Sequence, residues 1–122
     1  TCNPPYIPEG QVPVDPEVRD HDPELALYGG SADGLAIPAT MAARAADLLR
    51  PGGVLVMEHA DVQGPSLLRA LAAHAFWASA TDHPDLTGRQ RVVTATRTPP
   101  PGRGIPLPDS GTRLPRPGRA ET

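Results

Sequence analysis

The sequence predicts a small α/β domain built on an open sheet, and three consecutive segments indicate this fold class. Apolar residues recur at near-helical spacing over residues 35–49, and a proline and two glycines follow at residues 51–53. A short β-branched run occupies residues 54–57, and a second helical pattern opens at residues 63–66. Alternation of helix, strand and helix is typical of open α/β sheets, whose ligands bind at the carboxyl ends of the strands.

Residues 3–8, with the sequence NPPYIP, predict a rigid turn. Pro4 and Pro5 each fix their own φ, remove a backbone donor and push the preceding residue towards extended conformations. The turn is therefore stiff and non-helical. If Thr1 and Cys2 end a strand, the turn lies at the ligand-binding edge of the sheet.

The following segments predict a loop, a helix and a strand. Residues 6–30 have no sustained apolar period and contain four prolines, so we predict a long substrate-side loop with a helical turn at residues 23–27. A helix over residues 35–49 tolerates Pro38 only in its first turn. The run at residues 54–57 is continuous and apolar, as expected of a strand covered on both faces in a parallel sheet. The predicted apolar face of the helix comprises Leu35, Ile37, Met41, Ala45, Leu48 and Leu49.

The rest of the chain predicts a second helix, a strand pair and a tail. Residues 76–81 and 91–96 read as strands, and the turn-like residues 85–89 favour an antiparallel pair. We place the folded domain in residues 1–97 and a disordered tail, rich in Pro, Gly and Arg, in residues 98–122. The second helix opens with Pro65 near its first position, and its predicted apolar face comprises Leu67, Leu68, Leu71, Ala75 and Phe76.

Composition narrows the function classes. The 122 residues carry a net charge of −3 and no lysine, which argues against nonspecific binding to nucleic acid. Aromatic residues make up 3%, so we expect a core of mostly Leu, Val and Ala, and Trp77 is predicted to pack in the core or at its edge. Cys2 is the only cysteine, which excludes an internal disulfide and indicates the cytoplasm. We expect no membrane segment, and because the chain does not begin with Met we interpret it as a piece of a longer protein.

The rigid turn is the candidate site for binding a planar amide or amino group. It can hold the Asn3 carboxamide, the Pro4 carbonyl and the Tyr6 ring in fixed relative positions, which suits a planar amide or amino-purine. Such a nitrogen is a poor nucleophile because its lone pair is conjugated. Hydrogen bonds from its N–H groups to Asn3 and Pro4 would orient it for methyl transfer, and Tyr6 could stack on the planar group.

Four separated segments resemble one enzyme family. They are NPPYIP at residues 3–8, EVRDHDPELALYGGSADGL at 17–35, LLRPGGVLVMEHADVQG at 48–64 and DLTGRQRVV at 85–93. Their order and spacing resemble the carboxyl half of the bacterial glutamine methyltransferases that modify peptide chain release factors. The resemblance covers residues 3–97.

This resemblance implies a fold, a methyl donor and a substrate. The implied fold is the seven-stranded, Rossmann-like sheet of the class I methyltransferases. The implied donor is S-adenosylmethionine, and the implied target is the glutamine side-chain amide of a Gly-Gly-Gln loop in a release factor. The family's substrate turn corresponds to Asn3, Pro4, Pro5 and Tyr6. Asn3 and Tyr6 are the expected catalytic residues, and Asn3 is also the expected contact to the donor.

The chain departs from the family pattern in two respects. In the family, the glycine-rich donor loop and the acidic residue that binds the donor ribose precede the substrate turn. We therefore expect this chain to be the substrate-binding half of such an enzyme and to be inactive alone. The glycines present read as turn glycines, without Gly-x-Gly-x-x-Gly spacing. Ala60 and Gln90 stand where the family often has other residues, which leaves the roles of Glu58, Arg89 and Arg91 open.

The sequence also allows two other functions and contains two weaker candidate sites. The proline turn also occurs in adenine amino-methyltransferases of DNA and RNA, and a silent remnant or interaction module is a third possibility. His59 with Asp61, and His83 with Asp85, have too few partners at fixed spacing for a metal site, so we predict none. His21 and Asp22 could assist proton transfer, but a neighbouring His and Asp in a loop broken by prolines are more often solvated side chains.

Overall fold

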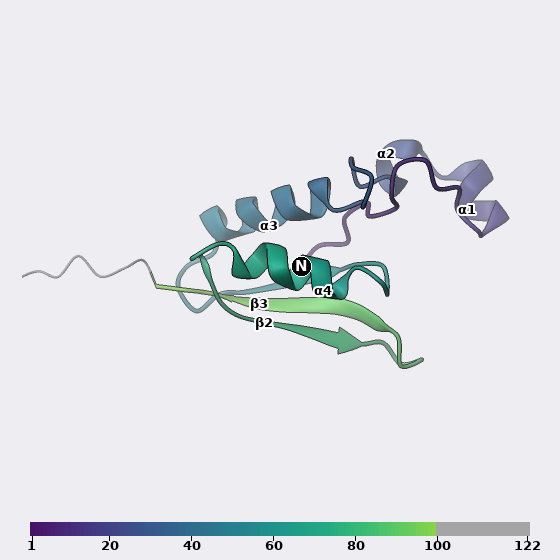
Figure 1. Ribbon diagram of the computed structural model, residues 1–122. Helices are drawn as coiled ribbons and strands as arrows, with labels where there is room; N and C mark the ends of the chain where they lie inside the picture. Colours follow the sequence, from purple (N-terminus) through teal and green to yellow (C-terminus); the bar gives the residue numbers. More distant parts are fainter. Residues whose placement is uncertain (100–122) are drawn as a thin grey trace, which may run out of the picture.

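The computed structural model describes residues 1–99, in which two helices lie on one side of a three-stranded sheet (Figure 1). The elements are α1 (Pro16–His21), α2 (Glu24–Leu27), α3 (Ala36–Leu48), β1 (Val54–Glu58), α4 (Gly64–Ala72), β2 (Trp77–Pro84) and β3 (Gln90–Arg97). Helices α3 and α4 cover the sheet, whereas α1 and α2 lie together at one end of the molecule (Figure 1). The described chain is therefore an α/β fold, as the sequence predicts.

The sheet has the order β1-β3-β2, with β3 antiparallel to both neighbours. The predicted antiparallel pair is confirmed. A parallel bridge joins Cys2 to Met57 on the other edge of β1. The prediction that residues 54–57 are covered on both faces is wrong for the described residues, because α3 and α4 lie on one face only. Burial accordingly alternates along β1, and Val54 is 52% exposed.

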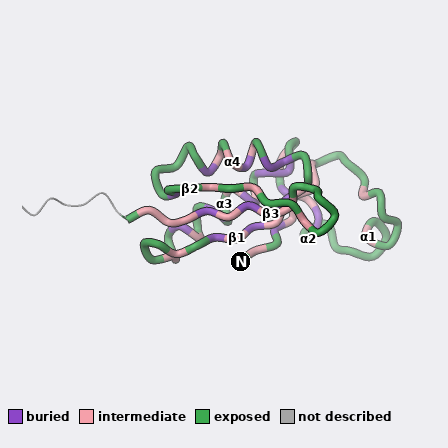
Figure 2. The backbone as a smooth tube through the Cα atoms, turned by 90° about the horizontal axis from the view of Figure 1, so that it is seen from below, coloured by how far each residue is buried: buried purple, intermediate pink, exposed green. Residues whose placement is uncertain are grey.

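One hydrophobic core lies between the two long helices and the inner face of the sheet. Met57, Leu67 and Val93 have no exposed surface, and Leu71 and Trp77 are also buried. The packing role predicted for Trp77 is confirmed. Along β1 and β3 buried residues alternate with partly covered ones, whereas the loop around α1 is largely exposed (Figure 2). The core therefore fixes the sheet firmly and the α1 region only weakly.

Helix α3 begins and ends within one residue of the prediction but buries a different face. Its buried residues are Pro38, Ala42 and Ala46. Met41 and Leu48, which the spacing placed in the core, are exposed. The small side chains on this face let α3 approach α4 closely, and the larger ones lie on its flank. There they border an apolar cavity of about 370 Å³ at the free edge of β1.

Two further boundaries differ from the prediction. Helix α4 ends before Ala75 and Phe76, so these residues do not continue its apolar face. The sequence does not predict α1, because Pro16 was interpreted as a break. Pro16 instead occupies the first turn of α1, and the Asp15 side chain accepts a hydrogen bond from Glu17 N at 2.9 Å. The helical turn predicted within the same loop is confirmed as α2.

The predicted boundary between domain and tail falls at Thr98. Thr98 N donates to Phe76 O at 2.8 Å, and Thr98 Oγ1 donates to Ala75 O at 2.7 Å. Thr98 is therefore hydrogen-bonded to the domain. Residues 100–122, which hold most of the predicted tail, lie outside the described residues. Across residues 1–99, no helix combines the length and the apolar character needed to cross a membrane.

Replacing Thr98 by valine is expected to lower the free energy of unfolding by about 1 kcal/mol, because the side-chain hydrogen bond is lost while the shape is kept. Urea denaturation of the 122-residue chain measures this change. Thr98→Ser keeps the hydroxyl and should stay within about 0.5 kcal/mol of the parent. Equal stability of the valine and serine variants would contradict a structural role for this hydroxyl.

Candidate functional site

The proline turn, residues 3–6, begins where β1 ends. Cys2 N donates to Val56 O at 2.9 Å, and Glu58 N donates to Cys2 O at 3.1 Å. Cys2 thus forms a parallel bridge with the last residues of β1. The turn starts at the carboxyl end of that strand, as the sequence predicts. Burial raises the pKa of the Cys2 thiol, so it stays protonated at neutral pH beside the strand.

Asn3 and Glu58 line one cavity of about 280 Å³. Asn3 is exposed and Glu58 is half-buried, whereas Pro4 is buried and Pro5 and Tyr6 are half-buried. The cavity therefore combines a carboxamide and a carboxylate, whose oxygens can accept hydrogen bonds from an N–H group. Tyr6 is not among its lining residues. The other lining residues are Thr1, Cys2, Val56 and Val92.

The second end of the proline turn is held by residues far away in the sequence. Ile7 N donates to Leu27 O at 2.8 Å, and Gly29 N donates to Ile7 O at 2.9 Å. Gln63 Nε2 donates to Tyr6 O, also at 2.8 Å. The turn is thus fixed at Cys2 on one side and at Tyr6 and Ile7 on the other.

Gln63 and Gly34 lie against the Tyr6 carbonyl, and the sequence analysis missed both. Gln63 is only 5% exposed and precedes α4 as its N-cap residue. Gly34 has φ +73°, and a Cβ added there would collide with Tyr6 O. A polar residue before a helix-opening proline was the available signal for Gln63. Nothing local indicated its partners, because Tyr6 and Asp33 lie 57 and 30 residues away.

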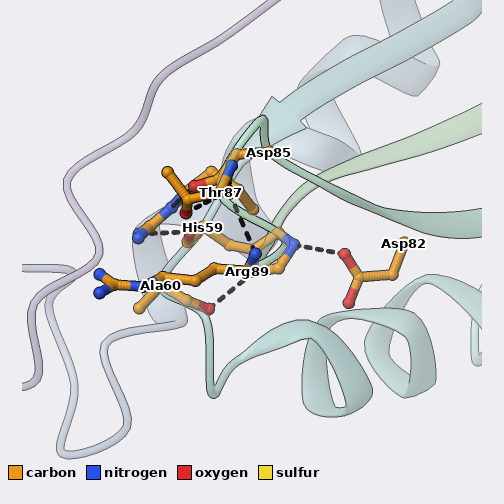
Figure 3. Close-up of polar contacts among 7 residues, drawn as sticks. His59, Ala60, Asp82, Asp85, Thr87 and Arg89 are labelled. Carbon is orange, nitrogen blue, oxygen red and sulfur yellow. Dashed lines mark hydrogen bonds and ion pairs between the residues drawn. The ribbon is translucent and has the colours of Figure 1, made fainter.

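His59 is fully buried and does not pair with Asp61 (Figure 3). Its Nε2 lies 2.9 Å from Asp82 Oδ1 and its Nδ1 lies 2.7 Å from Ala60 O. Both partners are acceptors, so a protonated ring donates to both at once. His59 lies in the loop just after β1, but it is not solvated there, because its buried ring joins this loop to Asp82 of β2. No three His, Cys, Asp or Glu side chains in residues 1–99 are grouped to hold a metal ion.

The loop between β2 and β3 is closed by Asp85 (Figure 3). Asp85 Oδ1 accepts hydrogen bonds from Thr87 N at 2.8 Å, Thr87 Oγ1 at 2.7 Å and Arg89 N at 3.1 Å. The Thr87 hydroxyl, then the Arg89 N–H and the Arg91 guanidinium, lower the pKa of the Asp85 carboxyl. Asp85 therefore stabilises a turn, as the DLTGR sequence predicts. His83, its partner in the second His-x-Asp pair, is instead 2.8 Å from Thr94 Oγ1.

Three bacterial proteins match most of this chain. A release factor glutamine methyltransferase of Bifidobacterium longum is 55% identical over 93 residues, which is 76% of this chain and 31% of that protein. Those of Streptomyces coelicolor and Deinococcus radiodurans are 50% and 48% identical over 99 and 96 residues, covering 80% and 78% of this chain. The chain is homologous to the carboxyl-terminal portion of release factor glutamine methyltransferases. No family model matches the sequence.

The chain spans about a third of the length of these curated release factor glutamine methyltransferases, and it matches their carboxyl-terminal portion. The resemblance stated from the four sequence segments is therefore confirmed. The match covers less than two thirds of each relative.

The structure limits the roles that the sequence left open for two arginines, Arg89 and Arg91. Arg91 Nη1 donates to His59 O at 3.3 Å, and Arg91 Nε lies 3.9 Å from Asp85 Oδ2. Arg91 thus connects the hairpin loop to the end of β1. Arg89 uses its backbone N–H towards Asp85, and the residue is exposed. His21 and Asp22 are exposed beside α1 and take no part in the cavity.

Proposed function

We propose that this chain forms the substrate-binding part of an S-adenosylmethionine-dependent protein-glutamine methyltransferase. Its substrate is the glutamine side-chain amide in the Gly-Gly-Gln loop of peptide chain release factors, in the cytoplasm. One observation carries the proposal: exposed Asn3 follows the parallel bridge at the carboxyl end of β1, within a turn stiffened by Pro4 and Pro5. The names of the relatives support the same substrate.

The proposed fold is the class I methyltransferase sheet, of which residues 1–97 form one side. An antiparallel β3 between β1 and β2, with a parallel partner at the other edge of β1, is consistent with that sheet. The apolar cavity of about 370 Å³ at this edge is bordered by Leu48, Leu49 and Val54. Such an uncovered apolar edge suits a sheet that continues beyond Cys2.

In the proposed reaction the proline turn orients the target amide. Asn3 Oδ1 and the Pro4 carbonyl each accept a hydrogen bond from the substrate NH₂ group, and the Tyr6 ring stacks on the amide plane. These contacts hold the nitrogen lone pair towards the methyl group. S-adenosylmethionine, when bound beside Asn3, would supply that methyl group to the nitrogen lone pair, and the electron pair of the carbon–sulfur bond would stay on sulfur. The nitrogen then releases one proton to solvent.

Asn3 is the residue of this chain that we assign to the donor as well as to the substrate. The cavity beside it, at about 280 Å³, is near the lower limit of about 300 Å³ for small-molecule sites. Its amide and carboxylate suit polar groups of the donor, and its volume suits only part of that molecule. Glu58, in the same cavity, is placed for a contact to either ligand. The residues present therefore fit one side of a donor site.

Mass spectrometry of a release factor tests the proposal. The factor is incubated with S-adenosylmethionine and either this chain or a fusion in which the amino-terminal two thirds of the Bifidobacterium longum relative precede Thr1. We expect one added methyl group on the Gly-Gly-Gln glutamine with the fusion and none with the chain alone. A release factor carrying Gly-Gly-Ala is the control.

Other outcomes decide between the alternatives. Methylation by the isolated chain would refute its predicted inactivity. A fusion that methylates adenine in DNA or RNA and leaves the release factor unmodified would replace the protein substrate with a nucleic acid. A folded fusion that modifies neither substrate would indicate a silent module.

A further inference from the structure

Gln63 is a buried polar side chain whose hydrogen-bonding groups are all used. Its Nε2 donates to Tyr6 O and to Asp33 O, both at 2.8 Å, and its Oε1 accepts from Ala60 N at 3.0 Å. A primary amide has two N–H donors, and both point at backbone carbonyls here. Three separate segments, the proline turn, residues 29–34 and the end of β1, therefore meet at one side chain.

The contact to Tyr6 fixes one peptide plane from both sides. The carbonyl of Tyr6 and the N–H of Ile7 belong to the same planar peptide unit. Gln63 holds its oxygen, while Leu27 O accepts its N–H at 2.8 Å. Gly34 packs against the same carbonyl, so a larger residue there would displace it. This peptide unit has little freedom to rotate.

Fixing this plane also fixes the residues before it. The turn is held at Cys2 by two hydrogen bonds to β1. Between the two fixed ends, Pro4 and Pro5 have no freedom in φ. The Asn3 side chain and the Pro4 carbonyl are therefore set by the two ends of a short, stiff segment.

We propose that Gln63 is a positioning residue that orients the proline turn, and through it Asn3, towards the substrate amide. The inference rests on the proposed function for its consequence in catalysis and on the hydrogen bonds alone for its structural part. Gln63 is also the N-cap residue of α4, and Leu67 on the next turn of that helix has no exposed surface. The turn is thus connected to the hydrophobic core through one amide.

Hydrogen exchange of the 122-residue chain, followed by NMR, tests the structural part. Gln63→Met removes both donors at nearly constant volume, and Gln63→Glu keeps the acceptor for Ala60 N but cannot donate. Leu71→Ala, which makes a cavity elsewhere on α4, is the control for general destabilisation. We expect the amide protons of Ile7 and Gly29 to exchange about tenfold faster, relative to those of β3, in both Gln63 variants, as for one lost hydrogen bond. In the Leu71→Ala variant the exchange rates of Ile7, Gly29 and the β3 amides should all increase by the same factor.

Kinetics of the fusion test the catalytic part. Gln63→Glu should lower kcat for the release factor by about tenfold to 100-fold through misplacement of the turn, with KM for S-adenosylmethionine within about twofold of the parent. Unchanged relative exchange at Ile7 and Gly29 would overturn the inference, whatever the activity. Faster exchange with an unchanged kcat would overturn its catalytic part alone. If the unsubstituted fusion methylates nothing, the proposed function fails, and the exchange result still decides whether Gln63 positions the turn.

Discussion

Replacing Asn3 by alanine is expected to reduce kcat of the fusion protein for the release factor by about 100- to 1,000-fold. The reason is that Asn3 Oδ1 is the proposed side-chain acceptor for the substrate N–H, and nothing else in the turn offers a carboxamide at that position. Asn3 is exposed, so its removal should leave the urea midpoint of the 122-residue chain unchanged. Methyl incorporation from labelled S-adenosylmethionine measures the rate.

Two variants distinguish this role from a general effect. Gln11→Ala removes the same functional group from another exposed loop residue and should leave kcat within about twofold. Asn3→Asp keeps an acceptor oxygen at the same place and should retain more activity than the alanine variant. If Asn3→Ala methylates as fast as the parent, Asn3 is not catalytic and the proposed orientation of the amide is wrong.

Gly34→Ala is expected to lower the free energy of unfolding by about 3 to 5 kcal/mol, through two combined effects. A φ of +73° is unfavourable for alanine, and the new methyl group would occupy the space of Tyr6 O, a backbone atom that cannot swing aside. The proline turn should be displaced in the variant. Urea denaturation of the 122-residue chain measures the stability.

Gly52 provides a matched control for this prediction. It has φ +79°, but nothing lies within 4 Å of an added Cβ. Gly52→Ala should therefore cost only the conformational term, about 1 to 2 kcal/mol. If the two alanine variants were equally stable, the close contact between Gly34 and the Tyr6 carbonyl would have no energetic weight.

The parts of the fold that the sequence predicted are those determined by local signals. The helical spacing before Leu49, the glycines that follow it and the turn residues around Asp85 each act over a few positions, and each is confirmed. Local signals gave wrong predictions where one residue type is compatible with two structures. Pro16 breaks a helix from within but favours its first turn, and the buried face of α3 is formed by Pro38, Ala42 and Ala46 rather than by the larger residues at helical spacing.

The part of the site formed by the proline motif could be predicted from the sequence. The part formed by contacts between residues far apart in the sequence could not. The two prolines marked the turn, and the parallel bridge at Cys2 agrees with the edge at which it was placed. Gln63 and the pairing of His59 with Asp82 depend on contacts 57 and 23 residues apart in the sequence. No spacing rule indicates such partners, because they are chosen by how β1 and β2 pack on their neighbours.

The position of β3 has a consequence for how the protein is made. Of the three strands in residues 1–99, β3 is the last to leave the ribosome, yet it lies in the middle, and β1 and β2 pair with β3 rather than with each other. Synthesis from β1 to β3 takes on the order of seconds at ordinary rates of translation. During that interval the backbone N–H and C=O groups of β1 and β2 that later pair with β3 are without these partners. A ribosome that stalls before residue 90 would therefore hold β1 and β2 without the strand that pairs with both of them, a state in which chaperone binding competes with aggregation.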